Sequence, residues 1–308
     1  MTAPTPQPST PPSLISRAPI SVWTTGQRPS RLQRLGRYVP ESMAHPAKML
    51  PAIAAHAIAT YTRPGDLVLD PMCGIGTTLV EAVHQGRHAA GIEYEPRWAR
   101  LAQLNLDHAR DHGAPGTGYA ITGDGRRAAE LVPQQAYGTV SLLVTSPPYG
   151  NLTHGQVATA RRTGGPVVKT HHRYSRDPAN LAHRHLDQLL DGFTHILRAC
   201  LPLLRPGGYV VITTRPYRIG GELIDLPTLT LAAAETTGLQ PVDRAAALLC
   251  GLRGDKIITR ASFFQMLEAR RHRQRGLPVH AIAHEDVLIL RRPELETGSE
   301  ASALPHVA

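Results

Sequence analysis

A short apolar segment that ends in an aspartate and runs into a glycine-rich turn constrains the fold of this chain most strongly. Residues 67–70 are typical of a strand, residues 71–78 contain Gly74 and Gly76, and a helical pattern follows. Glycine lets the backbone approach a ligand closely, and the start of a helix presents N–H groups without helical partners. A strand, a glycine turn and a helix form the first unit of a doubly wound sheet.

Later segments add strands that also end in polar or turn residues. Residues 89–93 end in Glu93, at roughly the 20-residue spacing at which an acid binds a ribose in such folds. Residues 120–124 end in Asp124, and residues 140–144 form a fourth strand. Ligands of doubly wound sheets bind outside the carboxyl ends of the strands. We therefore expect these polar residues along one edge of an α/β protein.

The fourth strand runs directly into Ser146, Pro147, Pro148 and Tyr149. Proline lacks a backbone N–H, fixes φ, and makes the preceding residue extended. The result is a rigid turn with a hydroxyl, oriented carbonyls and an aromatic ring, which suits a planar amine held under an aromatic face. The alternative is a strand that simply ends at two prolines, followed by a tyrosine of the core.

Composition limits the partners and the compartment. The 308 residues carry a formal net charge of +9, which favours a polyanionic partner, nucleic acid before a membrane. The three cysteines, Cys73, Cys200 and Cys250, fit neither a disulfide framework nor a CxxC metal pattern. No apolar run approaches the ~18 residues of a membrane span, and the N-terminus lacks a signal-peptide layout. We expect a cytoplasmic protein without metal or membrane contact.

The domain organisation has a central domain over residues 45–292, with residues 1–44 before it and a flexible tail over 293–308. Residues 1–18 have low complexity and are expected to be disordered, and residues 21–44 are either a basic arm over a cleft or a tethered tail. A helix is expected over 45–62. Residues 151–185 lack periodicity and are either a phosphate-contacting loop or a solvated insertion. The candidate nucleic-acid contacts there are Arg161, Arg162, Lys169, Arg173 and Arg176.

The rest of the domain is expected to contain helices over 186–204 and 223–238 and a strand over 209–214. Residues 255–258 and 285–290 are expected to form an antiparallel pair at the edge of the sheet. Between them, residues 263–275 are strongly basic and are either a second contact to a nucleic-acid backbone or an exposed helix face.

Four motifs in register resemble one family. DPMCGIGTT at residues 70–78 resembles the S-adenosyl-L-methionine loop of class I methyltransferases, and TSPPY at 145–149 resembles the catalytic motif of DNA amino-methyltransferases. HPAK at 45–48 resembles the element before that loop, and HEDVL at 284–288 resembles the last strand. Most of the chain is thus similar to the DNA N4-cytosine/N6-adenine methyltransferases.

The resemblance implies a Rossmann-like, mostly parallel seven-stranded sheet with helices on both faces, and S-adenosyl-L-methionine as cofactor. Glu93 would bind the ribose hydroxyls and Asp124 would lie near the adenine amine. The Ser146 hydroxyl and the Pro147 carbonyl would accept the hydrogens of the target amine, while Tyr149 stacks on a flipped base. Cys73 would be a packing residue rather than a nucleophile. The other residues implied in cofactor binding are Lys48, Asp70, Met72, Cys73, Gly74, Gly76, Thr77 and Thr78, and Pro148 completes the catalytic motif.

The chain departs from the family at two points. The cofactor loop precedes the Ser-Pro-Pro-Tyr motif, the reverse of the commonest N4-cytosine order, and Met72-Cys73 replaces Phe-Ala or Phe-Cys. The same motif order occurs in tRNA guanosine N2-methyltransferases, which usually carry Asp or Asn where this chain has Ser146. Those enzymes also bear an N-terminal RNA-binding domain, for which the first 44 residues are expected to leave no room.

These comparisons of motifs make DNA cytosine N4 the expected target, with DNA adenine N6 and RNA guanosine N2 as alternatives. A companion restriction endonuclease would be a partner of such an enzyme. A DNA-binding protein with a vestigial methyltransferase fold is the non-enzymatic alternative. Retention of Asp70, Glu93 and Asp124 beside Ser-Pro-Pro-Tyr argues against it, and failure to bind S-adenosyl-L-methionine would support it.

Overall fold

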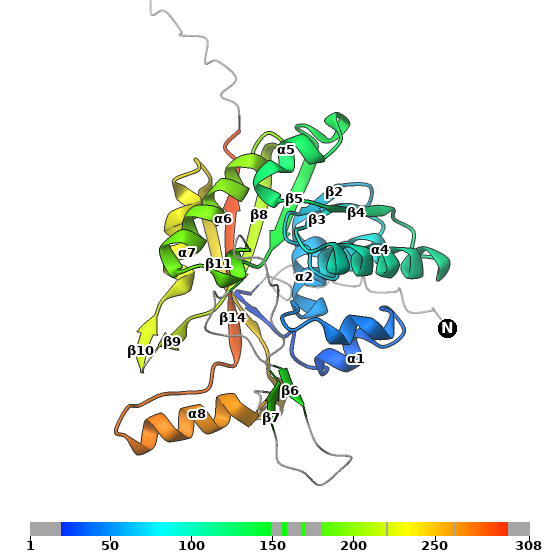
Figure 1. The fold of residues 1–308 in the computed structure, drawn as a ribbon. Coiled ribbons are helices and arrows are strands. Elements are labelled where there is room, and N and C mark those ends of the chain that lie inside the picture. The colour runs from blue at the N-terminus through cyan, green and yellow to red at the C-terminus, as the bar shows by residue number, and fades with distance from the viewer. Residues whose placement is uncertain are drawn as a thin grey trace, which may run out of the picture.

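The polar strand ends predicted from the sequence belong to one eight-stranded sheet in the computed structural model (Figure 1). The structure describes residues 20–148, 156–158, 168–170, 180–219, 221–260 and 263–294. In spatial order the strands are β1 (Val22–Trp23), β11 (Gln240–Leu248), β14 (His284–Arg291), β8 (Leu204–Thr214), β5 (Val140–Thr145), β2 (Leu67–Asp70), β3 (His88–Glu93) and β4 (Gly118–Thr122).

The sheet is parallel except where β14 takes part, because β14 pairs antiparallel with both β8 and β11. Seven of the strands form the expected mostly parallel sheet, which confirms the Rossmann-like fold class. The eighth, β1, pairs with β11 through Val22↔Ala246 and Trp23↔Ala247. Since β2, β3, β5 and β8 run in the same direction, their carboxyl ends meet at one edge of the sheet.

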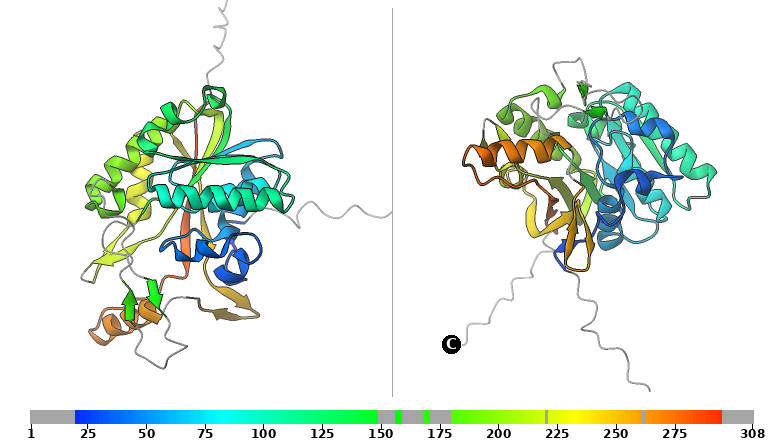
Figure 2. Two further views of the ribbon diagram at one scale, coloured as in Figure 1. Left: turned by 45° about the vertical axis from the view of Figure 1, so that its right-hand side comes forward. Right: turned by 90° about the horizontal axis from the view of Figure 1, so that it is seen from below.

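Helices cover both faces of the sheet because successive strand residues point to opposite sides. Val68 packs in one buried cluster with α2 (Pro51–Tyr61), α3 (Thr77–His84) and α4 (Pro96–Asp111). Leu69 packs in the other with α5 (Ala128–Leu131), α6 (Leu186–Cys200) and α7 (Leu226–Glu235). Figure 2 shows the sheet between these two layers.

Two expectations for the end of the domain were wrong. Residues 256–258 form β13 (Lys256–Ile258), which pairs in a small hairpin with β12 (Gly251–Arg253) and not with β14. The antiparallel partners of β14 are β8 and β11, so β14 is an interior strand, and its residues 287–290 are buried. The sequence analysis did not predict β11, because its first five residues are exposed and lack a strand-like apolar pattern.

The helix expected over 45–62 begins later, at Pro51. Leu50 is extended, with φ −69° and ψ 126°, as expected for a residue that precedes proline. Pro51 then occupies the first turn, where its missing N–H costs no helical hydrogen bond. The HPAK segment is consequently an extended connection at the edge of the cavity, not the first turn of a helix.

Residues 20–44 pack against the domain and form β1, α1 (Ser30–Arg34) and the 3-10 helix η2 (Pro40–Ala44). Trp23 is buried in the core cluster of α2 and α3. The amide of Gln33 donates to the Thr25 carbonyl at 2.9 Å and accepts from Ala52 N at 2.9 Å. This part of the segment therefore completes the sheet and the core and is not a tethered tail. Its residues Gly26, Arg28, Pro29 and Ser30 also line the cavity at the carboxyl edge of the sheet, in agreement with the alternative of a basic arm over a cleft. Residues 1–18 lie outside the described residues.

Several small elements extend from the carboxyl edge of the sheet, at the bottom of Figure 1. They are the hairpin β9 (Tyr217–Ile219) and β10 (Glu222–Ile224), the pair β6 (Gln156–Ala158) and β7 (Val168–Thr170), and α8 (Phe263–Gln274). The short helices η3 (Gly125–Arg127), η4 (Gln134–Ala136) and η5 (Leu181–His183) lie within connections. In the described part of the chain, no helix has both the length and the apolar character needed to cross a membrane.

Candidate active site

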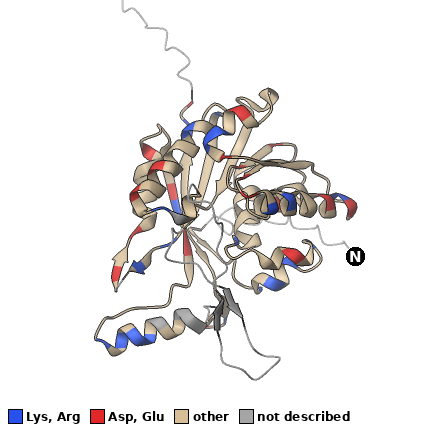
Figure 3. Cartoon of the chain, in the orientation of Figure 1, with Lys and Arg blue, Asp and Glu red and all other residues tan. Residues whose placement is uncertain are grey.

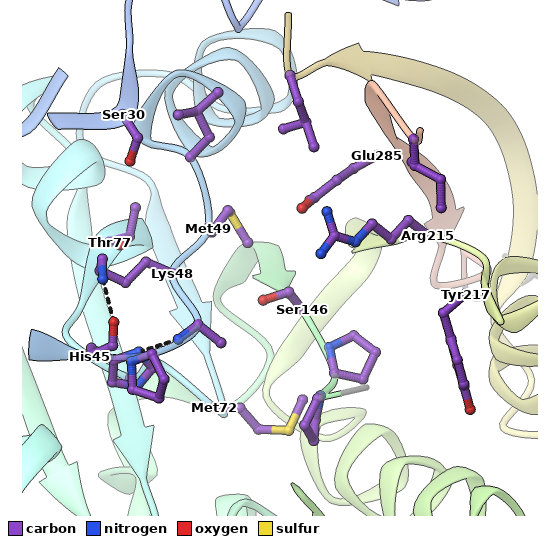
Figure 4. A pocket seen from close by; sticks show the side chains of 18 of the residues that line it. Ser30, His45, Lys48, Met49, Met72, Thr77, Ser146, Arg215, Tyr217 and Glu285 are labelled. Atoms are coloured by element: carbon purple, nitrogen blue, oxygen red, sulfur yellow. Dashed lines mark hydrogen bonds between the residues drawn. The ribbon is translucent and has the colours of Figure 1, made fainter. Parts of the chain in front are cut away.

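A cavity of about 1030 Å³ opens at the carboxyl edge of the sheet (Figure 4). Ligand pockets of proteins usually enclose ~300–1,000 Å³, so the cavity has room for a large ligand and part of a second one. The structure brings most of the sequence-predicted site residues together in its walls. Those that line it are Lys48, Asp70, Met72, Cys73, Gly74, Thr77, Thr78, Glu93, Asp124, Ser146, Pro147 and Pro148.

Glu93, at the end of β3, is held by backbone groups on both sides. Its Oε2 accepts from Gly74 N at 2.8 Å and its Oε1 from Glu95 N at 2.9 Å. A carboxylate has about four acceptor sites, so lone pairs remain for a ligand in the cavity. Burial raises the pKa of Glu93 to about 7, against the opposing effect of these two hydrogen bonds.

Asp70, at the end of β2, joins three parts of the site. Its Oδ2 accepts from Thr78 Oγ1 at 2.7 Å, and its Oδ1 accepts from Thr145 Oγ1 at 3.1 Å and from Met72 N at 3.1 Å. Burial raises the pKa of Asp70 to about 6, while these hydrogen bonds oppose the rise. Asp70 therefore fixes the glycine loop, the first turn of α3 and the end of β5 relative to one another.

Three glycines make room for the loop. Gly74 and Gly76 have φ of 54° and 78°, in the left-handed region that only glycine adopts readily. Gly76 is the N-cap of α3, and a Cβ there would lie 3.1 Å from the Ala102 Cβ. Gly91 in β3 is different, since its φ is ordinary but a Cβ would lie 2.5 Å from Leu79 Cδ1 and 2.9 Å from Cys73 Sγ.

Cys73 packs in the core and lines the cavity with the rest of the loop. Burial raises the pKa of its thiol well above the ordinary value, and the nearby Asp70 and Glu93 carboxylates raise it further. A thiol in that state is protonated at neutral pH and is a poor nucleophile. The packing role predicted from the sequence is the one its surroundings support.

Asp124, after β4, is engaged by its own chain. Its Oδ1 accepts from Arg126 N at 2.9 Å, and both carboxylate oxygens accept from the Arg126 side chain. Although partial burial acts to raise it, the pKa of Asp124 is lowered by these hydrogen bonds and by the positive charge of Arg126. Asp124 stays ionised at neutral pH, and its carboxylate lines the cavity beside Gly125 and Arg126.

The HPAK segment lines the cavity beside the glycine loop, where a Cβ at Gly74 would lie 3.3 Å from His45 Nε2. Burial lowers the pKa of His45 to about 3, so its ring is neutral, and it meets the Trp98 ring edge-on with centroids 4.5 Å apart. Burial and the charge of Arg34 lower the pKa of Lys48 to about 8. The Lys48 ammonium donates to the carbonyl of His45 (Figure 4) and to that of Met43. Lys48 thus fixes the bend of its own segment as well as lining the cavity.

The Ser-Pro-Pro turn lies at the end of β5, beside the part of the cavity that the glycine loop lines. Thr145, the last residue of β5, is hydrogen-bonded to Asp70, so the turn is tied to the glycine loop through one carboxylate. Ser146 is partly exposed into the cavity and Pro147 is buried. Tyr149 lies outside the described residues.

Several charged residues of the cavity were missed by the sequence analysis, namely Arg126, Arg215, Arg218, Arg260 and Glu285. Arg215 follows the carboxyl end of β8, and Glu285 is the second residue of β14. The sequence signal for Arg215 was its place after a predicted strand, the same signal that identified Glu93. Glu285 had no such signal, because an antiparallel strand begins where its parallel neighbours end.

The basic residues predicted to contact nucleic acid are not placed by the structure. Arg161, Arg162, Arg173 and Arg176 lie outside the described residues, and only the backbone of Lys169, in β7, is described. The second basic segment is α8, whose arginines are visible in Figure 3. Arg270, Arg271 and Arg273 are exposed there.

Two observations test whether the cavity fits S-adenosyl-L-methionine. The loop backbone is held open by glycines at Gly74 and Gly76, and Glu93 offers unused acceptor sites beside it. Met49, Met72 and Ile75 add apolar wall on which a planar ring can rest. These residues fit the cofactor. Within the described residues, no group of three or more His, Cys, Asp or Glu side chains could hold a metal.

Comparisons with known proteins agree with this geometry. A family model described as DNA methylase matches residues 15–104. Type II methyltransferase M.BglI of Bacillus subtilis is 32% identical over 93 residues, which cover 28% of this chain and 27% of that protein. The tRNA (guanine(10)-N2)-dimethyltransferase of Methanocaldococcus jannaschii is 30% identical over 129 residues, covering 41% of this chain and 36% of that protein. The chain thus spans only about a quarter to a third of these relatives.

Among solved structures, TrmN from Thermus thermophilus superposes with a TM-score of 0.50 and 18% identity, covering 85% of this chain and 53% of that one. The fold is that of the class I, S-adenosyl-L-methionine-dependent methyltransferases. The family match over residues 15–104 and the M.BglI relative support the amino-methyltransferase family that the motifs predicted. They also support S-adenosyl-L-methionine as the cofactor.

Proposed function

We propose that the chain is an S-adenosyl-L-methionine-dependent methyltransferase that acts on the exocyclic amine of a base in DNA, with cytosine N4 as the target. One observation carries the proposal. The Ser146-Pro147-Pro148 turn and the glycine loop that Glu93 holds line the same cavity, and Asp70 joins the two through hydrogen bonds to Thr145 and Thr78. A hydroxyl and a rigid carbonyl beside a cofactor pocket suit methyl transfer to a planar amine.

The target amine is a poor nucleophile because its lone pair is delocalised into the ring. S-adenosyl-L-methionine, when bound, supplies a methyl group activated by a positive sulfur. The Ser146 hydroxyl and the Pro147 carbonyl accept the amine hydrogens and draw the nitrogen toward a tetrahedral shape, and Tyr149 stacks on the base. Alignment of the amine and stabilisation of its developing charge supply most of the rate enhancement.

The cofactor would be held by the loop residues and by the acids at the strand ends. Glu93 binds the ribose hydroxyls with its remaining lone pairs, and Asp124 lies near the adenine amine. Thr77 lies at the start of α3, where helix N–H groups face the cavity. Asp70 acts through its hydrogen bonds, since three of its acceptor positions are used within the protein.

The base must leave the duplex to enter the cavity, which costs a few kcal/mol. Phosphate contacts from the basic loop (Arg161, Arg162, Lys169, Arg173 and Arg176) and from α8 would offset this cost and make binding depend on salt. A protein with this role works in the cytoplasm, where DNA and cofactor are available. A restriction endonuclease that cuts the unmethylated site is the partner such an activity predicts.

The test is sequencing that detects modified bases in DNA from cells that express the protein. Ser146→Ala and Tyr149→Ala variants, checked for intact S-adenosyl-L-methionine binding, serve as controls. We expect N4-methylcytosine within one sequence motif, absent from both variants. Methylated adenine would retain the mechanism and change the base.

The second candidate is methylation of guanine N2 in RNA, because one relative over 41% of this chain is a tRNA (guanine(10)-N2)-dimethyltransferase. The two candidate functions differ in the nucleic acid that accepts the methyl group. Unmodified DNA, together with methyl transfer from labelled cofactor to tRNA and with intact cofactor binding, would replace DNA by tRNA as the substrate.

A further inference from the structure

We infer that Arg215 recognises the ring atom next to the target amine, selecting a base with acceptor atoms there, and that Glu285 positions Arg215. The inference rests on the proposed function and deepens it, because it names cytosine as the base that the pocket fits. It assigns a specificity role to two residues that the motifs did not mark.

The register of the sheet places the two residues opposite each other. β14 and β8 pair antiparallel with Asp286 opposite Thr214, so the next step of the same register brings Glu285 opposite Arg215. Opposite charges that face each other across neighbouring strands attract at short range. Burial raises the pKa of Glu285, and the positive charge of Arg215 opposes that rise, in agreement with this pairing.

The order of the strands then decides which charge meets the substrate. β8 lies between β5 and β14, so Arg215 stands between Ser146 on one side and Glu285 on the other. Figure 4 shows the guanidinium of Arg215 beside the Glu285 carboxylate, with both groups facing the part of the cavity where the Ser146 hydroxyl lies. All three residues line the cavity. The group next to Ser146 is therefore a hydrogen-bond donor, with the acceptor behind it.

This order matches some bases and not others. When the amine of cytosine is at Ser146, the next atoms along the same edge are N3 and O2, both acceptors, which suit the planar fork of a guanidinium. Adenine offers one acceptor, N1, beside its amine. Guanine N2 has the N1–H donor on one side and a single acceptor, N3, on the other. The arrangement favours cytosine over adenine and guanine, because only cytosine presents two successive acceptors beside its amine.

Glu285 has a different role because it reaches the base only through Arg215. A guanidinium has five N–H donors, of which one carboxylate can accept two in a forked arrangement. A pairing of this kind would restrict the rotation of Arg215 before a base arrives and would keep its remaining donors in one direction. Glu285 is thus a positioning residue, and its loss should weaken recognition only while Arg215 is present.

The experiment measures methyl transfer by the full-length protein to duplexes that contain the motif found by sequencing. One duplex carries cytosine at the target and the other carries 3-deazacytosine, which has C–H in place of N3. Each is tested with wild-type protein, Arg215→Gln and Arg215→Lys. Arg244→Gln is the matched control, since Arg244 also pairs with an acid of β14, Asp286, at 2.7 Å but does not contact the cavity. S-adenosyl-L-methionine binding verifies the fold of every variant.

We expect Arg215→Gln to lower kcat/KM on cytosine by about 10- to 100-fold, the effect of removing a charge-assisted hydrogen bond. Arg215→Lys should recover part of that loss, and Arg244→Gln should behave as wild type. Replacing cytosine by 3-deazacytosine should lower the kcat/KM of wild type by a similar factor. It should change the kcat/KM of Arg215→Gln little, because removing either partner of one contact already removes the interaction. The wild-type comparison needs no variant and stands even where Arg215→Gln folds poorly.

Glu285→Gln provides the test of positioning. It should lower kcat/KM less than Arg215→Gln does, and the double variant should be no worse than Arg215→Gln alone. Equal losses on 3-deazacytosine for wild type and Arg215→Gln, with normal methylation of cytosine, would overturn this inference and leave the proposed function intact. Methylation of RNA guanine with none of DNA would overturn both.

Discussion

The Oε2 atom of Glu93 accepts a hydrogen bond from the backbone N–H of Gly74 at 2.8 Å, so the acid at the end of β3 holds the glycine loop that follows the neighbouring strand β2. The second oxygen accepts from Glu95 N at 2.9 Å and fixes the turn after β3. Glu93 therefore has two functions in one carboxylate: it shapes the loop and it presents lone pairs to the cavity. Its substitution should affect both.

Glu93→Gln should weaken S-adenosyl-L-methionine binding by about 10- to 100-fold, the range expected when one buried donor loses its partner. An amide has only one acceptor oxygen, so its NH₂ group must face either Gly74 N or Glu95 N. Titration calorimetry measures the effect. Glu130→Gln, at an exposed acid of α5, is the control and should bind as wild type does. Unchanged affinity in Glu93→Gln would show that the cofactor does not depend on this acid.

The pH dependence of stability should carry the signature of the same acid. Burial raises the pKa of Glu93 to about 7 from its usual 4.5, so between these values the folded chain holds a proton that the unfolded chain has released. The free energy of unfolding then falls as pH rises through this window. Asp70 acts in the same direction between 3.8 and about 6. His45, whose pKa falls to about 3, acts in the opposite direction below pH 6.5.

The contribution of Glu93 is isolated by comparing wild type with Glu93→Gln in urea, without cofactor, from pH 5 to pH 8. A neutral amide cannot titrate, so wild type should lose about 1–3 kcal/mol relative to the variant as pH rises to about 7, and nothing more above it. Glu130→Gln should parallel wild type at every pH. A constant difference between wild type and Glu93→Gln across the range would contradict the raised pKa.

A steric prediction follows from Gly91. A Cβ at this position would lie 2.5 Å from Cδ1 of Leu79 in α3 and 2.9 Å from Sγ of Cys73 in the glycine loop. Gly91→Ala should therefore destabilise the protein by about 1–3 kcal/mol, as overpacking of a core does. Leu79→Ala alone leaves a cavity, at a cost of about 2–5 kcal/mol. Urea unfolding should show the double variant less destabilised than the sum of the two, and simple additivity would contradict the steric conflict.

The sequence predicted the cofactor half of the site well because its signals are local. Glu93 and Asp70 each end a short apolar strand, and parallel strands bring their carboxyl ends together whatever their order in space. Gly74 and Gly76 mark backbone positions that only glycine adopts readily. The structure adds that Asp70 is occupied with Thr78, Thr145 and Met72 N, which spacing alone could not show.

The substrate half depends on pairing between segments far apart in the chain, and there the sequence was insufficient. Glu285 faces Arg215 only because β14 is an interior antiparallel strand, and that follows from β11 on its other side. β11 begins with the exposed residues 240–244, which include a proline and two charged side chains, so its strand character comes from its neighbours rather than from its own pattern. The packing of Trp23 beside α2 was hidden in the same way, within a segment that is rich in arginine, glycine and proline.

The last prediction concerns α8, the basic helix that begins after the β12–β13 hairpin and leads toward β14. Arg270 and Arg271 are exposed on it, at the edge of the sheet where the cavity opens. Arg270→Gln with Arg271→Gln should weaken DNA binding and reduce the slope of log K against log[salt] by about 0.9 for each phosphate that the variant no longer neutralises. Arg205→Gln is the matched control, because Arg205 is equally exposed but stands at the amino end of β8, on the opposite edge. Fluorescence anisotropy with labelled duplex at several salt concentrations measures both. A slope that is the same in the double variant, in Arg205→Gln and in wild type would show that α8 is an exposed helix face that does not bind phosphate.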